Sequence, residues 1–128
     1  MELDVVKTIL IVEDNPLNMK MLADLLGSQG YDVLCAEDGE PGFDMAKRHR
    51  PDLILMDIQL RNCSGLDVTR WLREDPATRD IPVVAVTAFA MRGDAEKVLA
   101  GGCDGYVPKP ISTRHFLETV RGFIGASH

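Results

Sequence analysis

The feature that most constrains the fold is a regular alternation of short apolar runs with longer amphipathic stretches. The apolar runs are rich in β-branched residues and cover residues 8–12, 32–36, 53–56, 82–86 and 105–107. The stretches after them have helical periodicity, over residues 17–26, 41–48, 66–73, 93–100 and 113–124. Strands that alternate with helices form a parallel sheet. The pattern therefore predicts a doubly wound α/β fold with helices on both faces and a ligand site at the carboxyl ends of the strands.

Size and charge limit what this chain can do. A chain of 128 residues with 45% apolar residues can close one hydrophobic core. We expect a single domain over residues 1–128, with its core at about residues 8–124. The 20 acidic and 14 basic residues give a net charge of -6, which repels a phosphate backbone, so nucleic acid is not an expected partner.

The N-terminus and the cysteines favour a cytoplasmic protein. Acidic residues stand where a signal peptide needs basic ones, and no apolar run reaches the roughly 18 residues that a membrane span requires. The three cysteines, Cys35, Cys63 and Cys103, form no CxxC pair, so neither a disulfide framework nor a zinc cluster is expected. The prediction is a protein of the reducing cytosol without membrane insertion.

Carboxylates follow two of the predicted strands. Glu13 and Asp14 come directly after the first strand, and Asp57 comes directly after the third. Carboxylates that converge on one sheet edge repel each other unless a cation lies between them. Hard oxygen ligands at this spacing suit Mg²⁺, which keeps several of its waters. The sequence thus predicts a divalent metal site at this edge.

Two further side chains are predicted to reach the same edge. Thr87 follows the fourth strand and supplies a hydroxyl, while Lys109 follows the fifth and supplies a compact cation. Together with Mg²⁺ they could hold a phosphoryl group while Asp57 attacks it, which would leave an acyl phosphate on Asp57. Each of these residues alone fits a turn, a helix cap or a solvated surface, and only their joint pattern favours this chemistry.

The motifs that carry these residues resemble those of the response regulator receiver family. The segments ILIVEDN, DLILMDIQL, VVAVTA and GYVPKP supply the acidic pair, Asp57, Thr87 and Lys109 in turn. The resemblance implies a flavodoxin-like fold with five parallel strands in the order 2-1-3-4-5. It also implies Mg²⁺ ligands from the side chains of Asp14 and Asp57 and the backbone carbonyl of Gln59, with help from Glu13 through water, and a cis peptide bond before Pro110.

The same resemblance implies a switch and a set of partners. Thr87 and Tyr106 would form the switch pair, and the fourth helix, fifth strand and fifth helix would form the readout face. A histidine kinase or a histidine phosphotransfer protein would donate the phosphoryl group, and Asn15, Leu17, Asn18 and Met21 of the first helix are candidates for that contact.

Longer segments narrow the resemblance within the family. VEDNPLNMKML, IPVVAVTAFAM and KPIS followed by HFLETV are similar to single-domain regulators of alphaproteobacterial cell division and polarity. This implies a stand-alone phosphorylated regulator rather than an enzyme. It would act through protein contacts, other kinases among them, and would be recruited to cell poles by its partners.

Two residues depart from the family pattern. Arg61 stands in the loop after Asp57 where receivers usually place a proline, which leaves the stiffness of that loop open. Phe89 stands two residues beyond Thr87, where some receivers carry a polar side chain that influences dephosphorylation.

Three alternatives to a phosphorylated receiver share parts of this pattern. A phosphohydrolase of the haloacid dehalogenase kind also uses a strand-end Asp and Mg²⁺, but it needs a second carboxylate where this chain has Gln59. A flavin or dinucleotide binder needs a Gly-rich or Ser/Thr-rich phosphate loop after the first strand, and this chain has acidic residues there. The third alternative is a receiver fold kept only for docking, and the intact set of motif residues argues against it.

Overall fold

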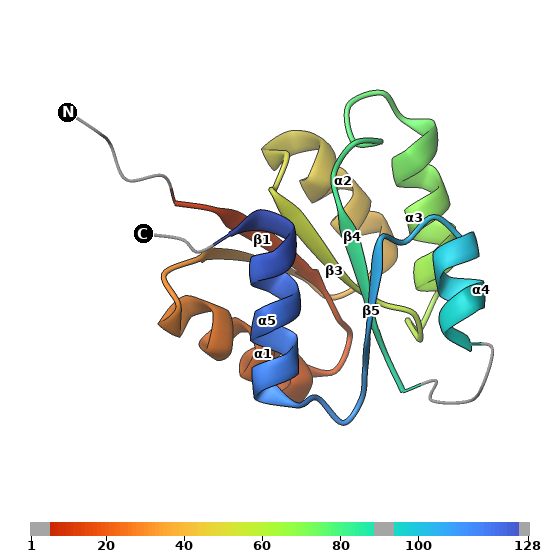
Figure 1. Ribbon diagram of the computed structural model, residues 1–128. Helices are drawn as coiled ribbons and strands as arrows, with labels where there is room; N and C mark the ends of the chain where they lie inside the picture. The colour runs from red at the N-terminus through yellow and green to blue at the C-terminus, as the bar shows by residue number, and fades with distance from the viewer. Residues whose placement is uncertain (1–5, 89–93, 126–128) are drawn as a thin grey trace.

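The structure, a computed structural model, describes residues 6–88 and 94–125, within which strands and helices alternate. The strands are β1 (Thr8–Val12), β2 (Asp32–Ala36), β3 (Leu53–Asp57), β4 (Val83–Thr87) and β5 (Gly105–Pro108). The helices are α1 (Pro16–Ser28), α2 (Gly39–His49), α3 (Gly65–Glu74), α4 (Asp94–Ala100) and α5 (Thr113–Ile124). The strands form one parallel sheet in the order β2-β1-β3-β4-β5 (Figure 1). The predicted fold class and strand order are confirmed.

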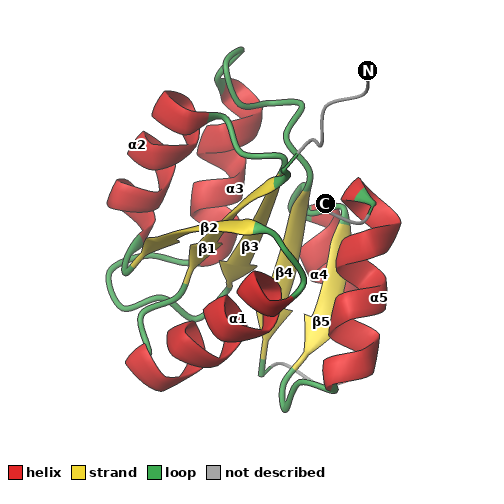
Figure 2. Cartoon of the chain, turned by 90° about the vertical axis from the view of Figure 1, so that its left-hand side faces the viewer, coloured by secondary structure: helices red, strands yellow, loops and turns green. Residues whose placement is uncertain are grey.

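Two apolar layers hold the helices against the sheet. Successive strand residues face opposite sides, so Leu10 and Ile54 pack with buried residues of α2, α3 and α4, while Ile9 and Leu55 pack with those of α1 and α5. Figure 2 shows α1 and α5 together on one side of the sheet. Because all five residues of β3 are buried, the central strand is a fixed support for the side chain at its carboxyl end.

The strand ends near the predicted site differ slightly from the sequence prediction. Asp57 belongs to β3 and pairs with Val86 of β4, and Thr87 belongs to β4 and pairs with Pro108 of β5. The prediction ended both strands one residue early, because it followed apolar side chains and strand pairing depends on the backbone. Pro82 was wrongly placed in a strand: it precedes β4, although its carbonyl accepts a hydrogen bond from the amide of Ile54 at 2.9 Å.

Polar caps fix the helix starts that follow the strands. The Asn15 side chain accepts hydrogen bonds from the amides of Leu17 and Asn18, and Ser64 forms a reciprocal capping box with Asp67. Asp38 caps α2 and starts it two residues before the predicted position. The predicted start of the fourth helix at residue 93 lies outside the described residues. Each cap fixes a loop beside the carboxyl edge of the sheet.

Candidate functional site

The three predicted carboxylates do meet at the carboxyl edge of the sheet. Glu13 and Asp14 leave β1, Asp57 ends the neighbouring β3, and one oxygen from each lies within 4.8 Å of the others. We call Glu13, Asp14 and Asp57 the acidic cluster. Carboxylate oxygens at this spacing are the donors that Mg²⁺ prefers, so the cluster fits that ion in both chemistry and charge.

Lys109 supplies a cation inside the acidic cluster. Its Nζ lies 2.9 Å from Oε1 of Glu13 and 3.5 Å from Oδ2 of Asp57. Its backbone amide donates to the carbonyl of Thr87 at 2.8 Å, and the bond to Pro110 is cis, as predicted. The structure therefore brings Lys109 to the predicted edge and shows that Glu13 is its nearer partner.

Glu13 is the most unusual carboxyl group of the site. It is 2% exposed, and its Oε2 accepts a long hydrogen bond from the amide of Asn15, at 3.3 Å. Burial, followed by the hydrogen bond to the neighbouring Asp57, raises the pKa of Glu13 to about 7, although Lys109 acts in the opposite direction. In the absence of a metal ion, part of the negative charge predicted from the sequence is thus neutralised by a proton on Glu13 near neutral pH.

Asp57 is held in a defined orientation. It is 4% exposed, and its Oδ1 accepts a hydrogen bond from the amide of Gln59 at 2.9 Å, while Oδ2 lies toward Lys109. The loop beyond it is closed by a bridge between Gln59 and Ser64. Behind it, Gly65 lies so close that an added Cβ would come within 2.3 Å of the Asp57 carbonyl oxygen. The backbone around Asp57 therefore leaves little freedom to its carboxylate.

Thr87 and Tyr106, the predicted switch pair, lie on neighbouring strands. Thr87 ends β4 and is fully buried, whereas Tyr106 of β5 is half-buried and pairs in register with Ala85. The Tyr106 side chain packs against the apolar layer that α2, α3 and α4 cover. Their positions allow the predicted coupling, and their switch roles stay a prediction. Phe89 lies outside the described residues.

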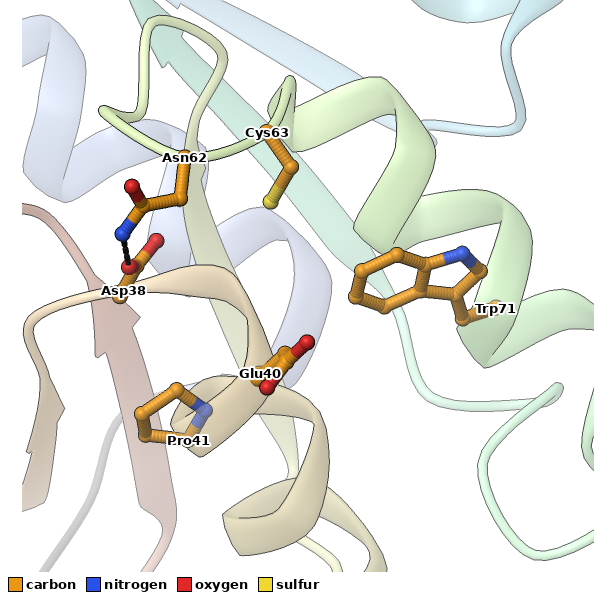
Figure 3. A pocket seen from close by; sticks show the side chains of 6 residues that line it. All are labelled: Asp38, Glu40, Pro41, Asn62, Cys63 and Trp71. Atoms are coloured by element: carbon orange, nitrogen blue, oxygen red, sulfur yellow. Dashed lines mark hydrogen bonds between the residues drawn. The ribbon is translucent and has the colours of Figure 1, made fainter.

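Sequence reasoning missed the contacts of the loop after Asp57. Arg61 donates from Nη2 to the backbone carbonyl of Asp14 at 3.3 Å, and its Nε lies 3.8 Å from Oδ2 of the same residue. The next residue, Asn62, donates to the Asp38 carboxylate, as the dashed line in Figure 3 shows. One sequence signal could have predicted the contact between Arg61 and Asp14. Arg61 is a cation four residues beyond Asp57, in a loop that was expected to lie beside acidic residues.

Comparison with known proteins agrees with this geometry. The model of the response regulator receiver domain matches residues 9–121. The polar-differentiation response regulator DivK of Brucella anthropi is 53% identical over 119 residues, which cover 93% of this chain and 97% of that protein. DivK of Brucella ovis is 52% identical over the same shares of both proteins.

Solved structures give the same result. The receiver domain of the sensor histidine kinase PA1611 from Pseudomonas aeruginosa, which has a magnesium ion coordinated in its active site cleft, is 36% identical and matches with a TM-score of 0.87. The match covers 95% of this chain and 100% of that one. A putative response regulator from Chloroflexus aurantiacus matches with a TM-score of 0.88 at 25% identity, over 93% of this chain and 98% of that one.

These matches confirm the two resemblances predicted from the motifs, to receivers in general and to regulators of polarity and cell division in particular. The family match runs from the second residue of β1 through most of α5, and thus includes every residue of the acidic cluster, Lys109, Thr87 and Tyr106. The chain belongs to the response regulator receiver domain family.

Proposed function

We propose that Asp57 accepts a phosphoryl group in a Mg²⁺-dependent reaction. The observation that carries the proposal is the geometry around this one side chain. Asp57 is buried, lies within 4.8 Å of two other carboxylates, and has Lys109 Nζ 3.5 Å from its Oδ2. A carboxylate in that position can act as a nucleophile, because the cations beside it offset the charge of the incoming group.

The metal would be held by the residues that the sequence analysis named. Asp14 and Asp57 would bind by side chain, Gln59 by its carbonyl, and Glu13 through water. The donor set consists of oxygens alone, as Mg²⁺ requires, and the magnesium ion of the PA1611 receiver supports the assignment. When bound, Mg²⁺ supplies positive charge that offsets the phosphoryl oxygens.

The chain's own residues would carry out the rest of the transfer. A carboxylate oxygen of Asp57 forms a bond to phosphorus, while the bond from phosphorus to the donor breaks and the donor leaves with that electron pair. The amide of Gln59 orients Asp57 through its 2.9 Å hydrogen bond to Oδ1. Lys109 moves from its pairing with Glu13 toward a phosphoryl oxygen, and the Thr87 hydroxyl turns to a second one.

The output of this reaction is a change at the face formed by α4, β5 and α5. The inward turn of Thr87 leaves space beside β4, and the half-buried ring of Tyr106 moves into it. Leu99 of α4 is 48% exposed, so this helix offers a partner an apolar side chain. Downstream proteins, histidine kinases among them, would recognise the altered face.

The donor surface would be formed by exposed residues of α1, which covers the same side of the sheet as α5. Leu17 and Met21 of α1 are 79% and 41% exposed, which is unusual for large apolar side chains. Met21 also lines a cavity of about 240 Å³ with Lys109 and Pro110. A histidine kinase or a phosphotransfer protein that covered these residues would bring its phosphohistidine to Asp57. Asn15, another candidate for the donor contact, has a structural role instead, because its side chain caps α1.

The cellular setting follows from the DivK relatives. Because those proteins are polar-differentiation regulators, we propose that this chain serves in cell-cycle or polarity control and reaches the cell poles through its partners. No helix within residues 6–88 and 94–125 is long and apolar enough to cross a bilayer.

The test is incubation with acetyl phosphate and Mg²⁺, followed by intact mass measurement. The native chain should gain one phosphoryl group as acetate leaves, and the gain should vanish in Asp57→Asn and in excess chelator. Asp44→Asn, which removes a carboxylate of α2 outside the acidic cluster, is the matched control and should behave as the native chain. An inert native chain, also inert toward its cognate kinase, would reject the proposal. Turnover of many equivalents of a small phosphate ester would favour the hydrolase alternative instead.

A further inference from the structure

Arg61 places a second cation at the acidic cluster, and nothing in the proposed function uses it. Lys109 pairs with Glu13 and Asp57, whereas Arg61 contacts Asp14 through both its guanidinium Nη2 and its Nε. The Arg61 side chain is 77% exposed and its contacts, at 3.3 and 3.8 Å, are long. It can therefore leave Asp14 at little cost and contact another group nearby.

The loop that carries Arg61 is fixed on its other side. Figure 3 shows Asn62 pointing to Asp38 in the loop before α2, with the Cys63 side chain beside them. Cys63 Sγ lies only 2.5 Å from the position that a Cβ on Gly39 would occupy, so this loop and the start of α2 are in close contact here. The residues that follow Arg61 are thus held against the loop before α2 and its first residue, while the exposed Arg61 side chain extends toward Asp14.

The charge of Arg61 has opposite effects on the two ligands of the site. When the acidic cluster is fully ionised, Lys109 and a bound Mg²⁺ together already balance its three carboxylates. A further cation at Asp14 then opposes metal binding. A phosphoryl group on Asp57 replaces one negative charge by about two, and the charge of Arg61 offsets this increase.

We propose, on the basis of the function proposed above, that Arg61 is a binding residue of the site that weakens Mg²⁺ binding and strengthens phosphoryl binding. In the metal-free protein the guanidinium lies against Asp14. When Asp14 binds Mg²⁺, the guanidinium of Arg61 is released. The guanidinium then donates a hydrogen bond to the phosphoryl group on the neighbouring Asp57. Arg61, which stands where receivers usually have a proline, would then raise the affinity of the site for the phosphoryl group relative to its affinity for Mg²⁺.

The test uses three variants and two inorganic probes. Arg61→Gln removes the charge and keeps a hydrogen-bond donor, Arg61→Lys keeps the charge and loses the planar fork, and Arg70→Gln removes a charge from the exposed face of α3. Mg²⁺ affinity is measured by titration of backbone amide NMR signals. The affinity for beryllium trifluoride, a phosphoryl mimic, is then measured at saturating Mg²⁺.

Opposite shifts for the two probes are the expected result. Arg61→Gln should bind Mg²⁺ about two- to fivefold more tightly and beryllium trifluoride about two- to fivefold more weakly, as the strength of an exposed ion pair suggests. Arg61→Lys should lie between Arg61→Gln and the native chain, and Arg70→Gln should match the native chain.

Three other results would overturn the proposal. Weaker binding of both probes by Arg61→Gln would mean that Arg61 only supports the loop, and equal binding would mean that it has no role. A shift of the same size in Arg70→Gln would trace the effect to net charge. The failure of the proposed function is distinguishable, because the native chain itself would then bind neither probe.

Discussion

At the scale of single residues, the site depends on charges that offset one another at short range. Lys109 Nζ lies 2.9 Å from Glu13 and 3.5 Å from Asp57, while Arg61 contacts Asp14. The two cations differ in setting, because the Lys109 side chain is 19% exposed and that of Arg61 is 77% exposed. Water screens the Arg61 contact much more strongly, so Lys109 is the main partner of the metal-free acidic cluster.

The raised pKa of Glu13 predicts a pH-dependent stability in the metal-free protein. Burial lifts this pKa from 4.5 to about 7, so the folded state holds a proton that the unfolded chain has lost. Its contribution is fully present below pH 4.5 and is lost as the pH rises through about 7. Urea unfolding in chelator should show that the unfolding free energy of the native chain falls by about 3 kcal/mol over this range relative to Glu13→Gln, by an order-of-magnitude conversion of the shift.

Two results bear on this prediction for Glu13. Saturating Mg²⁺ should remove most of the difference in pH-dependent stability between the native chain and Glu13→Gln, because a metal ion favours the ionised carboxylate. Parallel pH profiles of the two proteins in chelator would show that Glu13 keeps an ordinary pKa despite its burial.

At the scale of secondary-structure elements, close packing connects α3 to the end of β3. An added Cβ on Gly65 would lie 2.3 Å from the Asp57 carbonyl oxygen and 2.9 Å from the Ile58 Cα. Gly65 also donates its amide to the Ile58 carbonyl at 2.9 Å. The first residue of α3 therefore fixes how far the helix stands from Asp57.

Gly65→Ala should damage both stability and the site. The variant should lose about 1–3 kcal/mol of unfolding free energy, the usual cost of overpacking, and should be phosphorylated more slowly by acetyl phosphate. Gly27→Ala in α1 is the matched control, because nothing lies within 4 Å of its added Cβ. That variant should gain about 0.5–1 kcal/mol. Native stability and native phosphorylation in Gly65→Ala would show that the backbone near Asp57 tolerates displacement.

Arg73 joins α3 to the amino ends of β4 and β5. Its guanidinium donates to the carbonyls of Gly102, Arg79 and Ile81 at 2.7 to 3.1 Å, and to Asp104 at 2.6 Å. Arg73→Ala should lower the unfolding free energy by about 1–3 kcal/mol, because it leaves several acceptors without this partner. Arg70→Ala on the exposed face of the same helix should change it by less than about 0.5 kcal/mol. Equal losses in both variants, measured by urea unfolding, would contradict this role.

At the scale of the whole molecule, the sequence predicts the architecture better than the contacts of the site. The strands at residues 8–12 and 32–36 and the helix at residues 113–124 match the structure, because each has a continuous apolar or periodic signal. The strand order came from the family resemblance and is confirmed by the pairing of β1 with both β2 and β3.

The sequence predicted which residues meet at the site, but it did not predict which of them form ion pairs. The convergence of Asp14 and Asp57 follows from parallel topology, which the sequence signals clearly. The pairing of Lys109 with Glu13 joins residues 96 positions apart and depends on side-chain directions that no local pattern encodes. The contact of Arg61 with Asp14 depends on the path of one loop, where the family pattern gave a proline and no expectation for an arginine.

Metal binding should stabilise the whole domain, because the acidic cluster joins β1 to β3. If Mg²⁺ binds only the folded chain, a concentration of about 100 times the dissociation constant adds about 2.7 kcal/mol to the unfolding free energy. The midpoint of thermal unfolding should rise with Mg²⁺ in the native chain and stay nearly constant in Asp14→Asn. An equal rise in both proteins would place the ion elsewhere.

The central claim is that the phosphoryl group forms an acyl phosphate on Asp57, and chemical trapping tests it most directly. The native chain is phosphorylated with acetyl phosphate and Mg²⁺ and then treated with borohydride, which reduces an acyl phosphate of aspartate to homoserine. Peptide mass mapping should find homoserine at position 57 and at no other position. Homoserine elsewhere, or a phosphorylated chain that borohydride leaves unchanged, would contradict the claim.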